Sequence, residues 1–175
     1  MNIIKYLLLL LFISSWFEVT AQDTLDMKEV YIDNDLVYKY SDNERFTGVA
    51  QIKRRNGQVT YEEIYKDGVI LMDYQYYRGE GKKVCYKTVY NRYKLWVKEK
   101  EYYYPKSGKW TEMTSFDGNG SKILVEQFEK DKLTYSCQYS GKKKHGREFC
   151  YDDDGNELIF QYVNGKKQKK TNPTQ

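Results

Sequence analysis

A block of about 24 residues recurs roughly five times along this chain, and glycines at turn positions mark its period. These are Gly57, Gly81, Gly108 and Gly155, with Asp131 in the equivalent position of the fourth block, so that the intervals are 24, 27, 23 and 24 residues. A fixed period in this range indicates an array of small supersecondary units, each of which buries its apolar face only against its neighbours. The repeat therefore predicts the architecture of most of the chain, although it does not name a ligand.

Strand and turn signals alternate within the blocks. Runs rich in β-branched and aromatic residues occur at 61–65, 71–77, 84–90 and 93–97. Asn-Gly and Asp-Gly pairs between such runs place glycine where a tight hairpin turn requires a positive φ. No segment after residue 21 has convincing helical spacing. We therefore expect an all-β fold, an elongated single-layer antiparallel meander of about five repeated β-hairpins over residues 46–165.

The two ends of the chain differ from the repeats. Residues 22–28 are expected to be a loose lead-in, and the turn cluster 33–35 between two short apolar runs predicts a capping hairpin within residues 22–45. Residues 166–175 are expected to form a basic, disordered tail. The lysines of 166–170 would discourage association of the last strand with another sheet edge.

Residues 1–21 have the features of a secretory signal peptide. Lys5 precedes an apolar run of twelve residues from Tyr6 to Phe17, and small residues lead to Ala21. This pattern predicts a helical signal peptide that is cleaved after Ala21. Twelve apolar residues are too few to span a bilayer, which takes about 20; the alternative is that the segment is retained as an anchor. We therefore expect an exported protein, either periplasmic or extracellular.

The aromatic content suits a thin sheet. The chain has 19 tyrosines and a net charge of only +4, while Ile, Leu, Val and Phe are scarce. A tyrosine buries a large apolar ring and keeps its hydroxyl in water, as a sheet with two wet faces requires. Two tyrosine groups are the predicted partner-binding residues, namely Tyr74 with Tyr76 and the cluster Tyr102, Tyr103 and Tyr104.

Three cysteines invite a test for disulfide bonding. Cys137 and Cys150 flank a glycine- and lysine-rich segment, and a hairpin turn centred between Lys143 and Lys144 would place them directly opposite each other. Cross-strand neighbours are close enough to be bridged after a small adjustment. The sequence thus predicts a candidate Cys137–Cys150 disulfide, with two unpaired thiols as the alternative. Cys85 has no evident partner.

Residues that could support catalysis or metal binding are few. His145 is the only histidine, and Glu62 and Glu63 alternate onto opposite faces of a strand. The segment Ser115–Glu126 resembles a calcium loop only in part, because it offers just two carboxylates, and a glycine-rich turn is the preferred interpretation. We therefore expect no enzymatic activity, no catalytic residue, no cofactor and no metal.

The repeat pattern also has a family resemblance. Its residues are Phe46-Thr-Gly48, Asn56-Gly57 and Tyr65-Lys-Asp-Gly68, and again Tyr139-Ser-Gly141-Lys-Lys-Lys-His-Gly146, Asp154-Gly155 and Tyr162-Val-Asn-Gly165-Lys. This pattern resembles the bacterial variant of MORN repeats, a type that also occurs in antitoxin-like proteins of the YwqK family. The resemblance covers about half of the expected mature chain, residues 22–175, well and is weak from about Gly79 to Lys132. It implies stacked β-hairpins and a binding or scaffold role, and it brings no catalytic residues.

Two functions are consistent with these sequence features. The first is an exported, non-enzymatic module that binds or scaffolds another protein, in one form an immunity protein against a toxin that acts in the envelope. The alternative uses basic clusters near the predicted turns, at 53–55, 82–83, 142–144 and 166–170, for peripheral binding to anionic lipid or envelope polysaccharide. Nucleic acid is not an expected partner of an exported protein.

Overall fold

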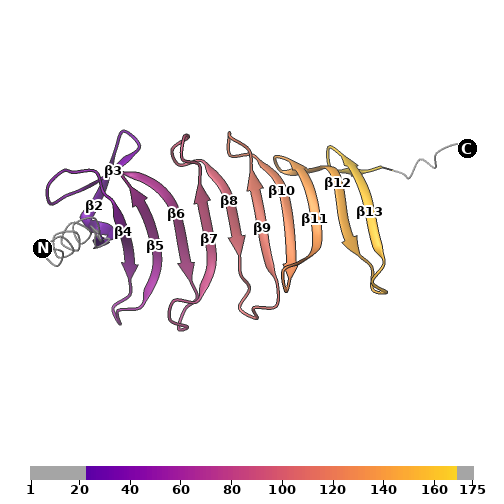
Figure 1. The fold of residues 1–175 in the computed structure, drawn as a ribbon, viewed down its shortest axis with the longest axis horizontal. Helices are drawn as coiled ribbons and strands as arrows, with labels where there is room; N and C mark the ends of the chain where they lie inside the picture. The colour runs from indigo at the N-terminus through magenta and orange to yellow at the C-terminus, as the bar shows by residue number, and fades with distance from the viewer. Residues whose placement is uncertain (1–22, 169–175) are drawn as a thin grey trace, which may run out of the picture.

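The computed structural model describes residues 23–168, which form a long antiparallel sheet with a small N-terminal cap (Figure 1). Twelve strands belong to one sheet, in the order of the sequence except that β1 lies next to β4. β2 and β3 form a separate two-stranded sheet. The expected all-β hairpin meander is therefore confirmed. The predicted signal peptide, its cleavage site and residues 169–175 of the tail lie outside the described residues.

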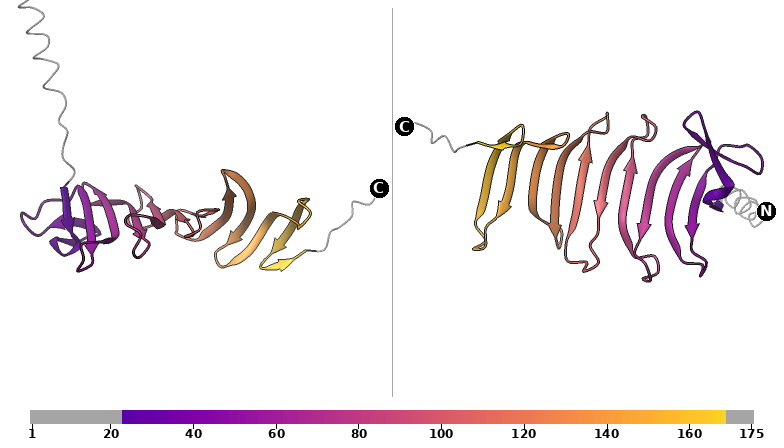
Figure 2. Two further views of the ribbon diagram at one scale, coloured as in Figure 1. Left: turned by 90° about the horizontal axis from the view of Figure 1, so that it is seen from below. Right: turned by 180° about the vertical axis from the view of Figure 1, so that it is seen from behind.

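The long sheet contains β1 (Asp23–Asp26), β4 (Gly48–Lys53), β5 (Val59–Lys66), β6 (Val69–Tyr76), β7 (Val84–Tyr90), β8 (Lys98–Tyr103), β9 (Thr111–Phe116), β10 (Lys122–Glu129), β11 (Lys132–Ser140), β12 (Lys143–Tyr151), β13 (Glu157–Val163) and β14 (Lys166–Lys167). The cap contains the 3₁₀ turn η2 (Met27–Glu29) and the hairpin of β2 (Val30–Asp33) and β3 (Leu36–Lys39). Seen from below, the sheet is one layer thick over most of its length, and only its N-terminal end is thicker (Figure 2).

Each sequence block corresponds to one hairpin together with the turn that leads to the next. The five marker positions therefore fall in turns at the same edge of the sheet, which we call the lower rim after its place in Figure 1. Their φ angles are 81° at Gly57, 61° at Gly81, 67° at Gly108, 65° at Asp131 and 81° at Gly155. Asp131 thus adopts the conformation of the glycines that it replaces, and the fourth repeat is regular in backbone although it is degenerate in sequence.

The apolar core of the described residues lies beneath the cap. Val37 of β3 and Phe46 pack against Ala50, Tyr65 and Ile70, and these five side chains are at most 3% exposed. Ala50, Tyr65 and Ile70 belong to one face of β4–β6, which we call the cap face; the opposite face has no covering layer among residues 23–168. The rest of the sheet is held by backbone pairing and by side chains that cover their cross-strand neighbours.

The structure corrects three expectations about local structure. Residues 23–26 are not a loose lead-in, because they form β1 and pair in parallel with β4. Residues 93–97 are not a strand but part of the loop between β7 and β8, in which Trp96 has a φ of 62°. The tail is not disordered from its start, because Lys166 and Lys167 form β14 against β13.

Gly48 shows why the Phe46-Thr-Gly48 motif ends in glycine. A Cβ at this position would lie 2.3 Å from the carbonyl oxygen of Asp23 and 2.8 Å from the ring of Phe46. Since Asp23 is the register partner of Gly48, a side chain there would push β1 off β4. The motif therefore joins the lead-in strand, the core aromatic and the first strand of the repeats.

Candidate partner-binding face

The register of four neighbouring strands places a row of side chains on the uncapped face. Glu62 pairs with Tyr74, Tyr74 with Lys87 and Lys87 with Tyr102, and residues opposite each other in a ladder share one face. Tyr76 and Tyr104 lie two residues further toward the lower rim. We call this surface, defined by Tyr74, Tyr76, Lys87, Tyr102 and Tyr104, the tyrosine face. The structure thus brings together four of the five tyrosines predicted from the sequence.

Lys87 lies between two stacked tyrosine pairs. The ring centroids of Tyr74 and Tyr76 are 6.4 Å apart and those of Tyr102 and Tyr104 are 6.3 Å apart, at interplanar angles of 16° and 12°. Lys87 Nζ is 5.8 Å from the Tyr74 ring centroid and 5.6 Å from that of Tyr102. At such distances a cation is attracted to the faces of both rings. The tyrosine face is therefore an ordered aromatic surface with a positive charge at its centre.

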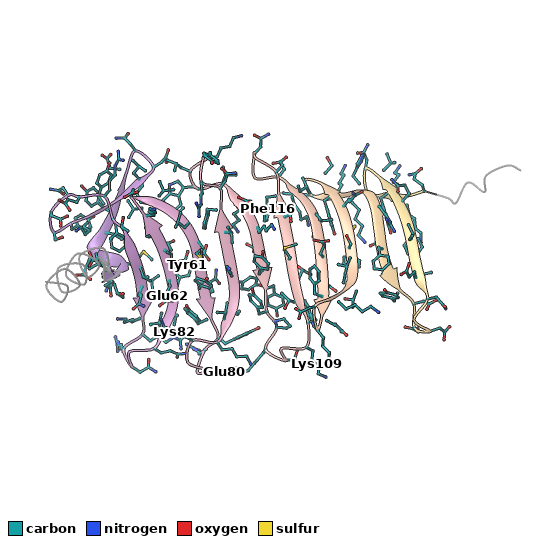
Figure 3. The ribbon with its side chains drawn as sticks, viewed as in Figure 1. Tyr61, Glu62, Glu80, Lys82, Lys109 and Phe116 are labelled. Atoms are coloured by element: carbon teal, nitrogen blue, oxygen red, sulfur yellow. The ribbon has the colours of Figure 1, made fainter. Side chains whose placement is uncertain are left out.

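A buried carboxylate fixes one end of this row. Glu62 is 7% exposed, and it accepts hydrogen bonds from Gln51 Nε2 at 2.5 Å, from Lys82 Nζ at 2.5 Å and from the hydroxyl of Tyr76. Burial works against the charge of Glu62, but the bonds from Lys82 and Tyr76 outweigh it and lower the pKa of this carboxyl. The same environment raises the pKa of Tyr76, first through burial. Figure 3 shows Glu62 and Lys82 near the lower end of β5 and β6.

Tyr103 lies on the other side of the sheet, which corrects its inclusion in the predicted cluster. It pairs with Tyr86 on the cap face, with ring centroids 4.9 Å apart, and it forms a T-shaped contact with Trp110. The reason is the alternation of side chains along a strand, which separates Tyr103 from both Tyr102 and Tyr104. Sequence inspection missed Lys87, because only the pairing of β6, β7 and β8 shows that it lies between the two tyrosine pairs.

The expected Cys137–Cys150 register is also wrong. The β11–β12 turn lies at Gly141 and Lys142, and a bulge follows, so that Cys137 faces Glu148. All three cysteines are free thiols, and Cys137 is fully buried. Glu148, 6% exposed, accepts hydrogen bonds from Tyr135 at 3.0 Å and from Lys144. This part of the cap face is a packed polar cluster, and it holds no disulfide.

The basic clusters divide between the two rims of the sheet. Clusters 53–55 and 82–83 lie at the lower rim, whereas 142–144 and the described residues of 166–170 lie at the upper rim. On the lower rim, Glu80 bridges adjacent hairpins, with Lys83 at 3.2 Å and Lys106 at 2.5 Å. Figure 3 shows Glu80 and Lys109 at this rim.

A hollow of about 370 Å³ opens beside the tyrosine face at the lower rim. Its aromatic lining is formed by Tyr102, Tyr104, Trp110 and Phe128. Lys109 and Lys130 contribute cations from two successive turns of the lower rim. Sequence reasoning did not find this hollow, because its lining comes from two hairpins whose spacing depends on the sheet. Within residues 23–168, no group of three His, Cys, Asp or Glu side chains is placed to hold a metal ion.

No helix among residues 23–168 has the length and apolar character needed to cross a membrane. Comparisons of the chain with protein-family models, with curated proteins and with solved structures find no match.

Proposed function

We propose that this chain is a non-enzymatic binding or scaffold module of an exported protein, and that it holds a protein partner on its tyrosine face. The observation that carries the proposal is the row Tyr74–Lys87–Tyr102, with Tyr76 and Tyr104 stacked at its border. Aromatic side chains are enriched in protein interfaces because they offer large contact areas at a small cost in conformational entropy.

The position of these tyrosines on paired strands supports the binding of a protein partner. Tyr74 and Tyr102 project from β6 and β8, whose backbones are paired on both sides, so that their positions are set before a partner arrives. Preorganisation of this kind reduces the entropy lost on binding. The half-buried rings keep contact with each other and with Lys87, while their outer surfaces face solvent.

Affinity purification of the tagged protein from its own host tests this proposal. The double variant Tyr74→Ala/Tyr102→Ala should lose the partner. The matched control Tyr86→Ala/Tyr103→Ala removes a tyrosine pair from the cap face and should retain the partner. Its rings are tilted by 34° and their centroids lie 4.9 Å apart, with Tyr86 on β7, next to β6, and Tyr103 again on β8. Equal recovery by both variants, or no specific partner in repeated experiments, would contradict the assignment.

A more specific form of this proposal is an immunity protein. The resemblance of the repeats to the bacterial MORN variant of YwqK-like antitoxin proteins supports this form. A neighbouring gene that encodes a toxin domain, with co-purification of the two products and protection of cells that carry both, is the expected finding. A captured partner without toxicity would contradict immunity and leave the binding role intact.

Export is proposed from residues 1–21 and has its own test. Cell fractionation should place the protein in the periplasm or the medium, and N-terminal sequencing of that material should begin at Gln22. A cytoplasmic protein that starts at Met1 would contradict export. A membrane-bound protein that starts at Met1 would favour the retained anchor.

A second candidate function is peripheral attachment to anionic lipid or envelope polysaccharide. It is favoured by the position of Lys53–Arg55 and Lys82–Lys83 on one rim of the sheet. Co-sedimentation with anionic vesicles or cell-wall material should then weaken as salt is added, because exposed charges are screened over about 10 Å at 0.1 M ionic strength. Sedimentation that is absent or insensitive to salt would remove this candidate.

A further inference from the structure

The lower rim is strongly basic over its first three turns. The segments 53–58, 77–83 and 104–110 contain eight cationic side chains, namely Lys53, Arg54, Arg55, Arg78, Lys82, Lys83, Lys106 and Lys109, and one carboxylate, Glu80. Successive turns on a rim are about 10 Å apart, because each is separated from the next by two strand spacings of about 4.8 Å. These cations therefore form a row along the border of the tyrosine face.

The positive charge is confined to one part of this rim. The turn between β12 and β13 carries Asp152, Asp153 and Asp154, so that the rim changes sign toward the C-terminal end of the sheet. Two carboxylates near the tyrosines are already engaged, Glu62 by Lys82 and Tyr76, and Glu80 by Lys83 and Lys106. Lys109 has no ion pair in the described part of the chain. A negative partner would therefore find unneutralised cations here.

The hollow beside Tyr102 joins the basic rim to the aromatic face. Its lining includes Tyr104 and Phe128 as well as Lys109 and Lys130, and Asp131 contributes its one carboxylate. A ligand group that enters the hollow is therefore within reach of both aromatic rings and cations. This combination suits an aromatic or aliphatic side chain that is flanked by carboxylates.

We propose that the partner presents an acidic polypeptide segment where the lower rim meets the tyrosine face, with its carboxylates along the basic rim and an apolar side chain in the hollow. This inference rests on the proposed function, because it names the chemistry of the partner held by the tyrosine face. The rim and the face of a sheet point in different directions. A bilayer is planar and contacts one or the other, whereas a polypeptide can follow both.

Fluorescence anisotropy with labelled synthetic peptides tests the proposal on the purified protein. The probe is a peptide of alternating Glu and Asp with one central Phe, and its control has Lys at every acidic position. Lys109→Glu/Lys130→Glu should weaken binding of the acidic peptide about tenfold, since two exposed attractions become repulsions. The matched variant Lys142→Glu/Lys143→Glu alters net charge equally at the upper rim and should change binding by less than about twofold. Circular dichroism should show that both variants remain folded.

Equal weakening by the two variants, or equal binding of the lysine peptide, would overturn the proposal. Vesicles of phosphatidylglycerol and the polysaccharide alginate serve as competing probes. If either binds through Lys109 and Lys130 while the acidic peptide does not, the partner is not an acidic polypeptide. If the partner recovered from the host is lost with Tyr74→Ala/Tyr102→Ala but kept by Lys109→Glu/Lys130→Glu, the proposed function stands and this inference fails. If both double variants keep the partner, the proposed function fails as well.

Discussion

Trp96 donates a hydrogen bond from Nε1 to the carbonyl oxygen of Asp35 at 2.8 Å, across 61 residues of sequence. This bond connects the β7–β8 loop to the turn of the capping hairpin, and the Trp96 ring also forms a T-shaped contact with Tyr90. The contact therefore connects the second hairpin of the repeats to the cap. In a repeat array, where units otherwise contact only their neighbours, such a contact couples the cap to the sheet.

We expect Trp96→Phe to lower the free energy of local unfolding of the cap by about 1 kcal/mol, because it removes this hydrogen bond and retains an aromatic ring. Native-state hydrogen exchange should show the loss in β2 and β3, with β10–β13 unchanged. Tyr93→Phe in the same loop is the control, since Tyr93 is 95% exposed. Unchanged protection of β2 and β3 in Trp96→Phe would show that this bond does not hold the cap.

Gly48→Ala should destabilise the N-terminal end of the sheet. The added Cβ would meet the Asp23 carbonyl at 2.3 Å, and overpacking of this kind costs about 1–3 kcal/mol. Urea unfolding and hydrogen exchange of β1 are the measurements. Gly57→Asn is the control, because nothing lies within 4 Å of a Cβ there and asparagine tolerates the positive φ. Similar losses in the two variants would contradict the steric explanation.

Asp73 should make the protein less stable as the pH rises. It is 3% exposed, and Tyr90 donates a hydrogen bond to Oδ2 at 2.8 Å, whereas Oδ1 has no partner among the described residues. Burial raises the pKa of Asp73, and the bond from Tyr90 offsets this only in part. The folded state therefore binds the proton more tightly than the unfolded state. The stabilisation that protonated Asp73 gives the folded state is complete below the unfolded pKa of about 3.9. It is lost as the pH rises through the pKa of Asp73 in the folded state.

Asp73→Asn should abolish this pH dependence. It should also raise the free energy of unfolding at pH 7, because the amide keeps an acceptor for Tyr90 and carries no charge. Urea titrations from pH 4 to pH 8 compare the two proteins, with the exposed Asp153→Asn as control. A variant that is less stable than the parent at pH 7, with the same pH dependence, would refute the electrostatic explanation.

Lys144→Met should destabilise the C-terminal hairpins by about 1–3 kcal/mol, because it leaves the buried Glu148 carboxylate without its cation. Burial opposes the charge of Glu148, but hydrogen bonds from Lys144 and Tyr162 outweigh it and lower its pKa. The stability from Glu148 is therefore present at neutral pH and is lost as the pH falls through the folded pKa. Without Lys144, the pKa of Glu148 should be higher, so the loss of stability on acidification should begin at a higher pH. Thermal unfolding measured from neutral to acidic pH tests both effects, with the exposed Lys143→Met as control. The same pH dependence of stability in the two variants would contradict them.

Thiol counting tests the cysteine assignment. In protein that is unfolded in guanidinium without reductant, three thiols per chain should react with Ellman's reagent, since Cys85, Cys137 and Cys150 are all free. In the folded protein, the fully buried Cys137 should react last. A single titratable thiol after unfolding would instead indicate a disulfide.

The glycine period, the tyrosine content and the turn dipeptides were sufficient to predict the hairpin meander, because each turn depends on local backbone conformation. Asp131 shows this well, since it takes a positive φ where the repeat places glycine in its sister units. The alternation of Tyr74 with Tyr76 and of Tyr102 with Tyr104 onto one face follows in the same way from the period of two along a strand.

The register between neighbouring strands and the contacts of the cap with the sheet could not be predicted from the sequence. Lys87 lies between Tyr74 and Tyr102 because of the β6–β7–β8 register, and Cys137 faces Glu148 because the β11–β12 turn and the bulge after it shift the ladder. β1 pairs in parallel with β4, and Trp96 reaches Asp35, only because the cap folds over the sheet. These contacts depend on hydrogen-bond register and on packing between distant segments. A repeat period in the sequence carries information on neither.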